Sequence, residues 1–204
     1  MIKTKSANVK AVLKKGDSIE LKYGEWGGLG LDIVELDCGY SLDFNSDTQP
    51  ISMLKSLKKL TMYATSIDNL SFAISLSQLE VLECGINNIV DLTPLTNLKL
   101  LKKLRLAENS IEDLGPLENL DNLIELDVSD NCVKSLAPIA KLKNLKIIDF
   151  VYQRPLIKDL TPLKQLKDLK IAMVGGHPVS YDELKSMVEK NKNIAGLFNG
   201  DHKI

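Results

Sequence analysis

A repeat of 22 residues is the feature that most constrains the fold of this chain. Leucine returns at this spacing five times, at Leu57, Leu79, Leu101, Leu123 and Leu145. Each of these leucines is followed by the same pattern of apolar positions. The clearest copy contains Leu101, Leu104, Leu106, Asn109, Ile111, Leu114, Pro116, Leu117 and Leu120. A fixed period of this length indicates stacked repeats, each of which we call a coil.

Not every copy of the pattern is regular. The copy that begins at Leu57 has Thr65 at the Asn position and Phe72 at the Pro position. The copies that begin at Ile33 and Leu145 are 24 residues long instead of 22. We expect their extra residues after the strand, around Ser41 to Asp47 and Gln153 to Pro155. The array therefore has six coils and a partial seventh.

The chemistry of each position explains the pattern. Alternating leucines point to one side of a short strand, because side chains of a strand alternate between its faces. The Asn can bond to backbone groups nearby, so that a buried turn keeps its hydrogen bonds. The Pro fixes φ and favours one 3₁₀-like turn over a long helix. A single coil cannot bury its own apolar side, whereas stacked coils share one core.

The pattern LxxLxLxxNxIxDLxPLxxLxx resembles the 22-residue leucine-rich repeats of the bacterial internalin family and the related SDS22-like class. The resemblance spans roughly residues 33 to 180. It implies an α/β leucine-rich-repeat solenoid, with a curved parallel β-sheet on the concave side and short 3₁₀ or irregular turns on the convex side. We expect an N-terminal cap over 1–32, repeats over 33–179, and a C-terminal capping helix and tail over 180–204.

Both ends of a solenoid need covers, because a terminal coil would otherwise expose its core. At the N-terminus we expect a short helix from Ser6 to Lys15 that Gly16 ends. An edge strand containing Ile19, Leu21 and Tyr23 follows, and Trp26 is available to plug the core. At the C-terminus the last coil departs at His177-Pro178. Ser180 and Glu183 form a capping box for a helix whose apolar stripe is Leu184, Met187 and Val188.

Composition argues against several classes of function. The formal net charge of −1 does not favour a nucleic-acid binder, although lysines and arginines cluster locally near Arg105. We find no secretory signal, and no run of about 18 apolar residues that would insert into a membrane. Three cysteines without regular spacing fit neither a disulfide framework nor a zinc site. We therefore expect a cytoplasmic, monomeric protein.

Reactive residue types have structural explanations in this pattern. Cys38 and Cys84 occupy leucine positions, where we expect small buried side chains too far apart for a disulfide. Cys132 lies beside the Asn position, where we expect partial exposure. His177 falls at an Asn position and is expected to make a structural hydrogen bond. The glycines near Gly28 lack the Lys of a phosphate-binding loop. We expect no enzyme activity, no metal and no cofactor.

Side chains between the leucines face the concave side of the sheet. Acidic groups there surround a basic pair, Lys103 and Arg105, and apolar residues cluster toward the C-terminal end. The apolar cluster consists of Ile147, Val151, Tyr152, Ile171 and Met173. Apolar patches suggest interfaces, unless the C-terminal cap or the loop near Arg154 folds over them. The predicted partner-binding residues are Tyr63, Glu83, Lys103, Arg105, Glu125, Asp127, Asp149, Tyr152, Ile147, Ile171 and Met173.

The sequence thus favours a non-catalytic module that binds another protein on its concave face. An acidic face suits a partner with a basic surface, and an inhibitor or immunity protein is a narrower form of this hypothesis. The alternative is an internalin-like surface adhesin or scaffold whose export signal is absent from this chain. The internalin resemblance implies an export signal and a surface anchor, and neither is seen here.

Overall fold

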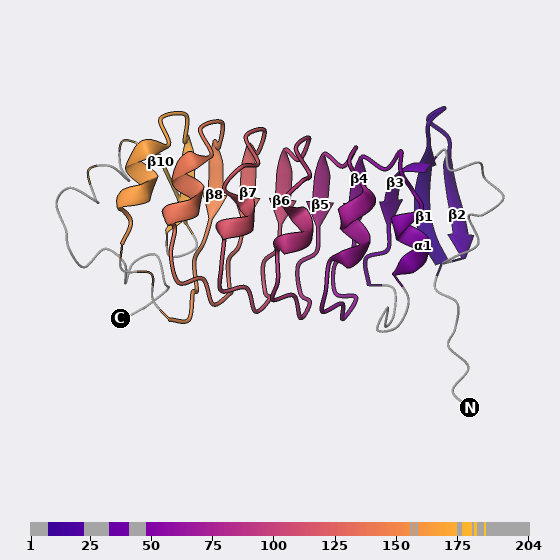
Figure 1. Cartoon of the computed structure of the whole chain (residues 1–204), viewed down its shortest axis with the longest axis horizontal. Coiled ribbons are helices and arrows are strands. Elements are labelled where there is room, and N and C mark those ends of the chain that lie inside the picture. Colours follow the sequence, from indigo (N-terminus) through magenta and orange to yellow (C-terminus); the bar gives the residue numbers. More distant parts are fainter. Residues whose placement is uncertain are drawn as a thin grey trace.

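The computed structural model describes residues 8–22, 33–40, 48–155, 157, 159–174, 177–180, 182 and 186. Its strands form one open sheet in the order β10-β9-β8-β7-β6-β5-β4-β3-β1-β2. The strands stand side by side along the length of the molecule, and the helical turns cover one face of the sheet (Figure 1). The predicted solenoid is therefore confirmed.

Parallel strands, one from each coil, make up most of the sheet. They are β3 (Ile33–Asp37), β4 (Lys59–Thr61), β5 (Val81–Glu83), β6 (Lys103–Arg105), β7 (Glu125–Asp127), β8 (Ile147–Asp149) and β9 (Ile171–Val174). Equivalent repeat positions pair without any slip, so that Leu60, Leu82 and Leu104 lie in one row. Register follows the repeat, because a slip of one residue would expose every leucine.

The return segments form the opposite face as single helical turns. They are α1 (Gln49–Ser52), η1 (Ser71–Ser75), η2 (Thr93–Leu95), η3 (Gly115–Leu117), η4 (Ala137–Lys141) and η5 (Thr161–Gln165). All except η1 have a proline in their first turn, where its missing N–H costs nothing. The predicted 3₁₀ turns are confirmed for η1 to η5.

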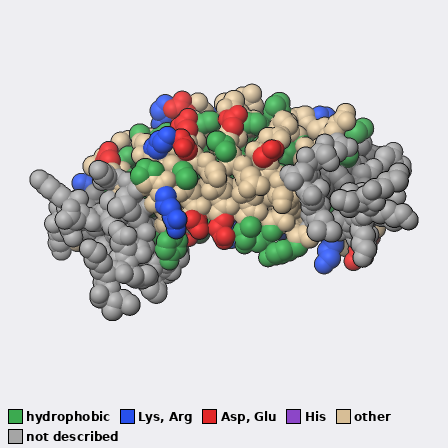
Figure 2. Space-filling model, turned by 90° about the horizontal axis from the view of Figure 1, so that it is seen from below, with side chains coloured by type: hydrophobic (Ala, Val, Ile, Leu, Met, Phe, Trp, Pro, Cys, Tyr) green, Lys and Arg blue, Asp and Glu red, His purple; other side chains and the backbone are tan. Residues whose placement is uncertain are grey.

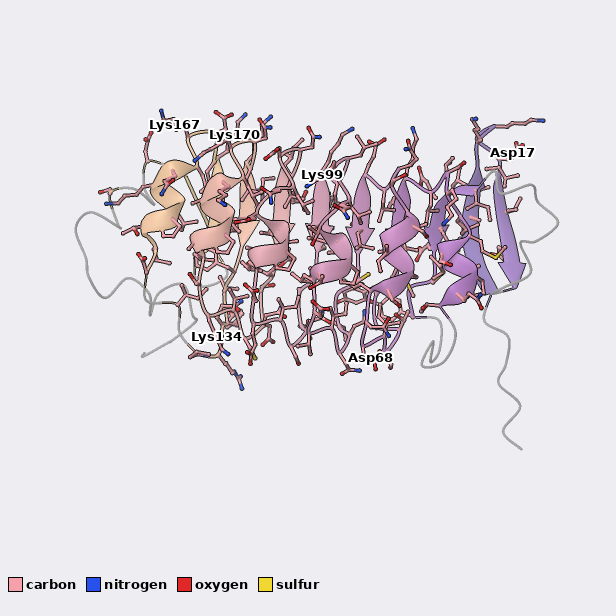
Figure 3. All side chains as sticks on the ribbon, viewed as in Figure 1. Asp17, Asp68, Lys99, Lys134, Lys167 and Lys170 are labelled. Atoms are coloured by element: carbon pink, nitrogen blue, oxygen red, sulfur yellow. The ribbon has the colours of Figure 1, made fainter. Side chains whose placement is uncertain are left out.

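The core lies between the sheet and these turns. Repeat leucines from Leu54 to Leu166 fill it, and nearly all have no exposed surface. Charged side chains of the connecting turns project outward along the two long edges. Figure 3 shows Lys99, Lys167 and Lys170 along the edge where the strands begin, and Asp68 and Lys134 along the edge where they end. The repeat thus separates an apolar interior from polar edges.

In four coils, the side chain at the ninth repeat position joins the coil to the one before it. Asn131 donates from Nδ2 to the carbonyl of Leu106 in the preceding coil, at 2.9 Å, and to two carbonyls of its own turn. Its Oδ1 accepts the N–H of Ile111, also in the preceding coil, at 2.9 Å. Asn87 and Asn109 bond in the same way. We call this row the asparagine ladder, and it satisfies the backbone of buried turns.

Two other residue types occupy ladder positions. Gln153 is buried and donates to the carbonyl of Val128 at 2.7 Å, while its Oε1 accepts the N–H of Val133. It therefore belongs to the ladder, and the extra residues of its coil come after it rather than beginning with it. In the looser coil, Thr65 is buried and donates to the carbonyl of Met62. Thr65 therefore lies in a buried turn, at the position where other coils have Asn.

The N-terminal cap is a β-hairpin, so the predicted helix from Ser6 to Lys15 is wrong. Residues Asn8–Leu13 form β1, which lies antiparallel between β3 and β2 (Ser18–Lys22). Val9 and Ala11 alternate inward and extend the core, which outweighs any local preference for a helix. Gly16 makes the turn at a φ of 95°. The predicted edge strand is confirmed as β2, while Tyr23 and Trp26 lie outside the described residues.

At the other end, β10 (His177–Ser180) turns back antiparallel to β9. His177 therefore pairs with Val174 in a strand and does not occupy a ladder turn, which corrects its predicted position. The coil pattern ends here because the chain reverses before a ninth-position turn forms. Asp182 and Ser186 are helical, and the remainder of the predicted capping helix lies outside the described residues.

Replacing Asn131 by Ala tests the ladder. The substitution leaves the N–H of Ile111 and three carbonyls without their side-chain partner. We expect the free energy of unfolding to fall by about 3 kcal/mol or more, because buried polar groups lose their hydrogen bonds. Denaturant unfolding followed by circular dichroism measures this loss.

Asn122→Ala is the matched control. Asn122 is exposed, and its amide donates to one carbonyl, that of Lys99. We expect a change within about 1 kcal/mol. Equal losses for the two variants would show that the ladder contributes no more than a surface hydrogen bond.

Candidate functional site

On β3 to β8 the concave face carries two rows of outward side chains, one from each side of the buried central residue of the strand. Over β3 to β8 the third-position row reads Glu35, Lys59, Val81, Lys103, Glu125 and Ile147. The fifth-position row reads Asp37, Thr61, Glu83, Arg105, Asp127 and Asp149. Over β3 to β8 these rows contain six carboxylates and three cations, so the face is acidic overall.

A groove of about 780 Å³ runs across these strands. Its lining brings together Tyr40 and Tyr63 from the N-terminal coils with Asp127, Ile147 and Asp149 from the C-terminal coils. Figure 2 looks onto the edge where the parallel strands end. Along the hollowed side, Asp and Glu side chains lie between two groups of hydrophobic side chains. The groove thus has an aromatic part and an acidic part.

The middle of the groove is occupied by a network of ion pairs. Arg105 lies 2.8 Å from Glu125 through Nη2 and 3.3 Å from Glu83 through Nη1. Lys103 contacts the other carboxylate oxygen of Glu125 at 3.2 Å. The predicted basic pair is therefore neutralised by carboxylates on the neighbouring strands. This network orders the side chains at the centre of the face, although exposed pairs add little stability.

Asp127 and Asp149 form a second pair of carboxylates on adjacent strands. Asp127 accepts hydrogen bonds from the N–H and hydroxyl of Ser129, and Asp149 accepts one from the N–H of Val151. In the described part of the chain, no Lys or Arg lies within ion-pair distance of either. Burial raises the pKa of Asp149 to about 6, partly offset by the Val151 hydrogen bond and increased by the charge of Asp127.

Two tyrosines form the aromatic part of the groove. The ring centroids of Tyr40 and Tyr63 are 5.4 Å apart with planes tilted by 59°, an arrangement that aromatic pairs favour. The Tyr63 ring lies against Gly85 in the next coil, where a β-carbon would approach its Cε2 to 3.0 Å. Burial, Tyr40, Glu108 and Asp127 raise the pKa of the Tyr63 phenol. This ring therefore extends toward the acidic coils.

Exposed side chains at the eighth repeat position border the groove. Tyr40, Ile86, Glu108, Asp130 and Tyr152 all have a positive φ between 47° and 58°. This conformation is unfavourable for a β-branched residue such as Ile86. It is held by backbone hydrogen bonds to the next coil, for example from Ile86 N–H to the carbonyl of Ala107 at 2.9 Å. The row is fixed in direction and presents mixed apolar and acidic groups.

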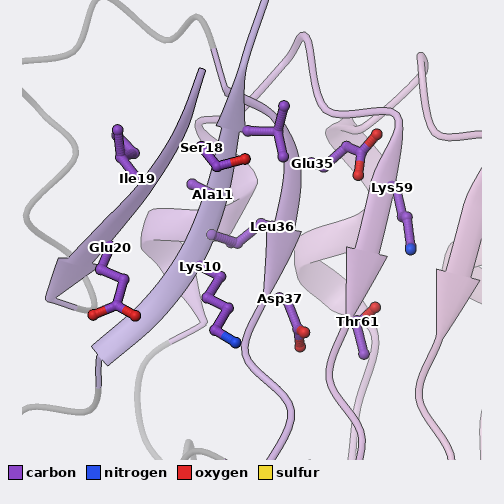
Figure 4. A pocket seen from close by; sticks show the side chains of 11 residues that line it. Lys10, Ala11, Ser18, Ile19, Glu20, Glu35, Leu36, Asp37, Lys59 and Thr61 are labelled. Atoms are coloured by element: carbon purple, nitrogen blue, oxygen red, sulfur yellow. The ribbon is translucent and has the colours of Figure 1, made fainter. Parts of the chain in front are cut away.

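A smaller hollow of about 490 Å³ lies at the N-terminal end of the concave face. Figure 4 shows that β1, β2, β3 and β4 all contribute side chains, among them Lys10, Glu35, Asp37 and Lys59. Lys10 and Asp37 are register partners on β1 and β3. Its charged groups of both signs leave this hollow without the acidic bias of the larger groove.

The structure brings most predicted binding residues onto one face. Seven of them line the large groove: Tyr63, Glu83, Arg105, Glu125, Asp127, Ile147 and Asp149. Lys103 lies beside it in the ion-pair network, and Tyr152 is exposed at its border. Ile171 and Met173 belong to β9, and their side chains lie outside the described residues. Whether these residues bind a partner stays a prediction.

Val151 does not belong to the predicted apolar patch, because its side chain is only 3% exposed. It precedes the positive-φ residue Tyr152, and the turn directs it inward while Tyr152 remains exposed. Of the five patch residues, Ile147 is half-buried and Tyr152 exposed. Among the described side chains, the apolar patch predicted from the sequence therefore consists of Ile147 and Tyr152.

Sequence reasoning missed several residues of the groove. Lys10 was placed in a helix, although the inward alternation of Val9 and Ala11 was a signal for a strand. Tyr40 was not among the predicted binding residues, and its contact with Tyr63 crosses between coils. Gly85 carried no signal, since its role is to leave room for the Tyr63 ring.

Three kinds of feature in the described residues bear on chemistry and membrane insertion: groups of metal ligands, thiols and long apolar helices. No group of three His, Cys, Asp or Glu among them could hold a metal ion. Burial raises the pKa of the Cys38 and Cys84 thiols well above the usual range, so that both stay protonated. Cys38, Cys84 and Cys132 are free, the first two are buried, and Cys132 is partly exposed, as predicted. No described helix is long and apolar enough to cross a bilayer.

Comparison with known proteins places the chain among repeat proteins. Residues 121–165 match the family model described as Leucine Rich repeats (2 copies). Comparison with curated proteins gives no match.

Several solved structures are similar. Internalin C2 from Listeria monocytogenes is 33% identical with a TM-score of 0.60, over 62% of this chain and 55% of that one. The internalin inlF from the same species is 26% identical with a TM-score of 0.57, over 76% and 50%. A leucine-rich-repeat protein of Leptospira interrogans is 28% identical with a TM-score of 0.53, over 58% and 32%. The chain thus spans about half the length of the internalins that it matches.

Asp149 gives the groove a testable dependence on pH. Because its folded-state pKa is raised to about 6, the folded protein binds its proton more tightly than the unfolded chain. The contribution of Asp149 to stability is therefore greatest at low pH and is lost as pH rises from about 4 to about 6. Asp149→Asn should be more stable than the original chain by about 1 kcal/mol at pH 7.5, after discounting for solvent screening.

Urea unfolding at about pH 4.5 and about pH 7.5 measures the difference. We expect the advantage of Asp149→Asn to shrink strongly at the lower pH, where Asp149 is itself protonated. Asp121→Asn, at an exposed site on the edge where strands begin, is the control. An advantage that is the same at both pH values would contradict the buried, proton-binding carboxyl.

Proposed function

Because the chain is a leucine-rich-repeat protein of the internalin-like class, we propose that it is a non-catalytic module that binds another protein on the concave face of β3 to β8. Such repeats typically serve as protein-binding modules, since stacked coils present an extended concave surface. The proposal names this face because the opposite face is built from short turns around the core.

The carboxylate pair of Asp127 and Asp149 is the observation that carries this proposal. The two groups face one groove from adjacent strands, and no cation in the described part of the chain compensates them. Two neighbouring carboxylates repel each other and lose solvation on burial. A cationic group from a partner would relieve both effects and would find its hydrogen-bond acceptors already in place.

The dimensions of the face suit a protein partner. Strands of a sheet lie about 4.8 Å apart, so β3 to β8 span about 24 Å across the strands. Tyr40, Ile86 and Tyr152 are exposed at the border of the groove, and each has a positive φ. Tyrosine is a frequent anchor of interfaces. We propose a monomeric module with a basic partner in the cytoplasm. An inhibitor of a basic toxin or enzyme is one form that this function would take.

The double substitution Asp127→Asn and Asp149→Asn tests this function. Asn retains an oxygen that can accept the bonds from Ser129 and Val151, while both negative charges are removed. We expect affinity for the partner to fall by about tenfold or more, because a charge-assisted pair contributes more than a neutral one. Quantitative mass spectrometry of proteins captured from the native host by each variant identifies the partner and measures the loss.

Asp121→Asn is the control for capture, because this exposed carboxylate lies on the edge where strands begin rather than in the groove. A true partner is retained by Asp121→Asn and lost from the double variant. A partner that all three proteins capture equally would show that binding takes place elsewhere.

Surface adhesion is a second candidate, favoured by the similarity to two internalins. It predicts that the protein reaches the outside of the cell, whereas the first candidate places it in the cytoplasm. Protease treatment of intact cells followed by immunoblotting separates the two. Digestion of the protein in intact cells supports adhesion, and protection until the cells are lysed supports the cytoplasmic module.

A further inference from the structure

In the groove, carboxylates of this chain already hold a guanidinium group of the same chain. Arg105 lies between Glu83 on the preceding strand and Glu125 on the following one, at 3.3 and 2.8 Å. The planar guanidinium has donors on several sides, which suits carboxylates that approach from two strands. This arrangement shows that carboxylates from two strands of this sheet can hold one guanidinium group.

Asp127 and Asp149 lie one and two strands beyond Arg105 and present two carboxylates on adjacent strands. They face the same groove from adjacent positions of the fifth-position row. Hydrogen bonds from Ser129 and Val151 use Oδ1 of each carboxylate and hold both side chains. The second oxygen of each, Oδ2, has no hydrogen-bond partner among the described residues. The pair therefore offers two fixed acceptors to a cation from outside.

Tyr63 supplies a different seat for a planar cation at the other end of the groove. Its ring packs against the tilted ring of Tyr40 and lies close to Gly85 of the next coil. The negative charges of Glu108 and Asp127 act on its phenol. An aromatic face near carboxylates attracts cations, and a guanidinium also stacks on it with its flat surface.

The two seats are separated by a distance that an extended chain can match. The Tyr63 ring lies over the coil of β5, and the carboxylate pair belongs to β7 and β8. With strands about 4.8 Å apart and an offset of two residues along the strand, the separation is about 13 Å. In an extended chain, residues four apart point to the same side and lie about 13 Å from each other.

We propose that the groove recognises an extended basic segment of the partner protein with two arginines four residues apart, one stacked on Tyr63 and the other between Asp127 and Asp149. This proposal rests on the proposed function and adds the chemistry and spacing of what is bound. The ion-paired centre at Arg105 lies between the two seats, and its carboxylates, Glu83 and Glu125, are already paired with cations, so a third cation finds no free partner there. Uncharged residues in the middle of the segment are therefore favoured.

Short peptides of identical composition test the spacing. The probe is Arg-Thr-Ser-Thr-Arg with blocked ends, and the comparison peptide is Thr-Arg-Arg-Thr-Ser with the same blocking. Both carry the same charge, so nonspecific attraction to an acidic face treats them alike. We expect the first to bind about fivefold more tightly in a titration followed by two-dimensional NMR. Lys-Thr-Ser-Thr-Lys should bind about fivefold more weakly than the arginine peptide of equal spacing, because lysine cannot stack or bind in a bidentate manner.

Substitutions at each seat should remove the preference. Tyr63→Leu should bring the two arginine peptides to equal affinity, while Tyr63→Phe keeps the aromatic face and the preference. The double variant Asp127→Asn and Asp149→Asn should also abolish it, and Asp121→Asn should leave it unchanged. Circular dichroism confirms that each variant is folded, and the acidic seat provides a second test should Tyr63→Leu fail to fold.

The results separate this inference from the proposed function. Equal binding of the two arginine peptides to the original chain overturns the spacing, as does a preference that survives both seat variants. Loss of the natural partner from the acidic double variant would still support the concave face in that case. Conversely, a spacing preference that depends on both seats supports the inference even when the partner captured from cells binds elsewhere.

Discussion

Hydrogen bonds from one side chain in each of four successive coils hold this structure together. Asn87, Asn109, Asn131 and Gln153 each bond to the backbone of their own turn and of the coil before it. Without them, the turns that follow the strands would bury backbone groups lacking partners. With them, each coil stacks on its neighbour in one register, and that register aligns the leucines inside and the functional rows outside. The surface is therefore a consequence of the ladder.

The ladder also fixes the border of the groove. Each ladder residue follows a residue with positive φ, such as Ile86, Glu108 or Asp130, whose N–H donates to the next coil. Side chains at this position have no place in the core, and their conformation is unfavourable for all but a few residue types. Their direction is set by the backbone while their identity is free to vary. Large groups such as Tyr40 and Ile86 thus present apolar surface at a cost to folding.

Features that follow from the 22-residue period were predicted correctly from the sequence, whereas part of the structure beyond the ends of the repeat array was not. The coils, the leucine core, the buried Cys84 and the two concave rows all follow from the 22-residue spacing. At the N-terminus, the alternation of Val9 and Ala11 indicated a strand, but the pairing of β1 with β3 decides the structure, and no local pattern reports a partner 20 or more residues away. Gln153 was taken for an insertion because its role depends on hydrogen bonds to another coil. The contact of Tyr63 with Gly85 was invisible for the same reason.

The electrostatics of the groove connect this fold to a partner. A repeat brings equivalent positions together whatever their charge. Like charges on adjacent strands must therefore pair with opposite charges, or their repulsion lowers the stability of the fold. At Glu83 and Glu125 the chain supplies Arg105, and the network is closed. At Asp127 and Asp149 the described residues supply only hydrogen-bond donors, and Asp149 retains a raised affinity for a proton. A proton relieves that repulsion in the free protein, and an arginine of a partner would relieve it in a complex. Binding of such a partner should therefore compete with protonation of Asp149 and weaken as pH falls below about 6.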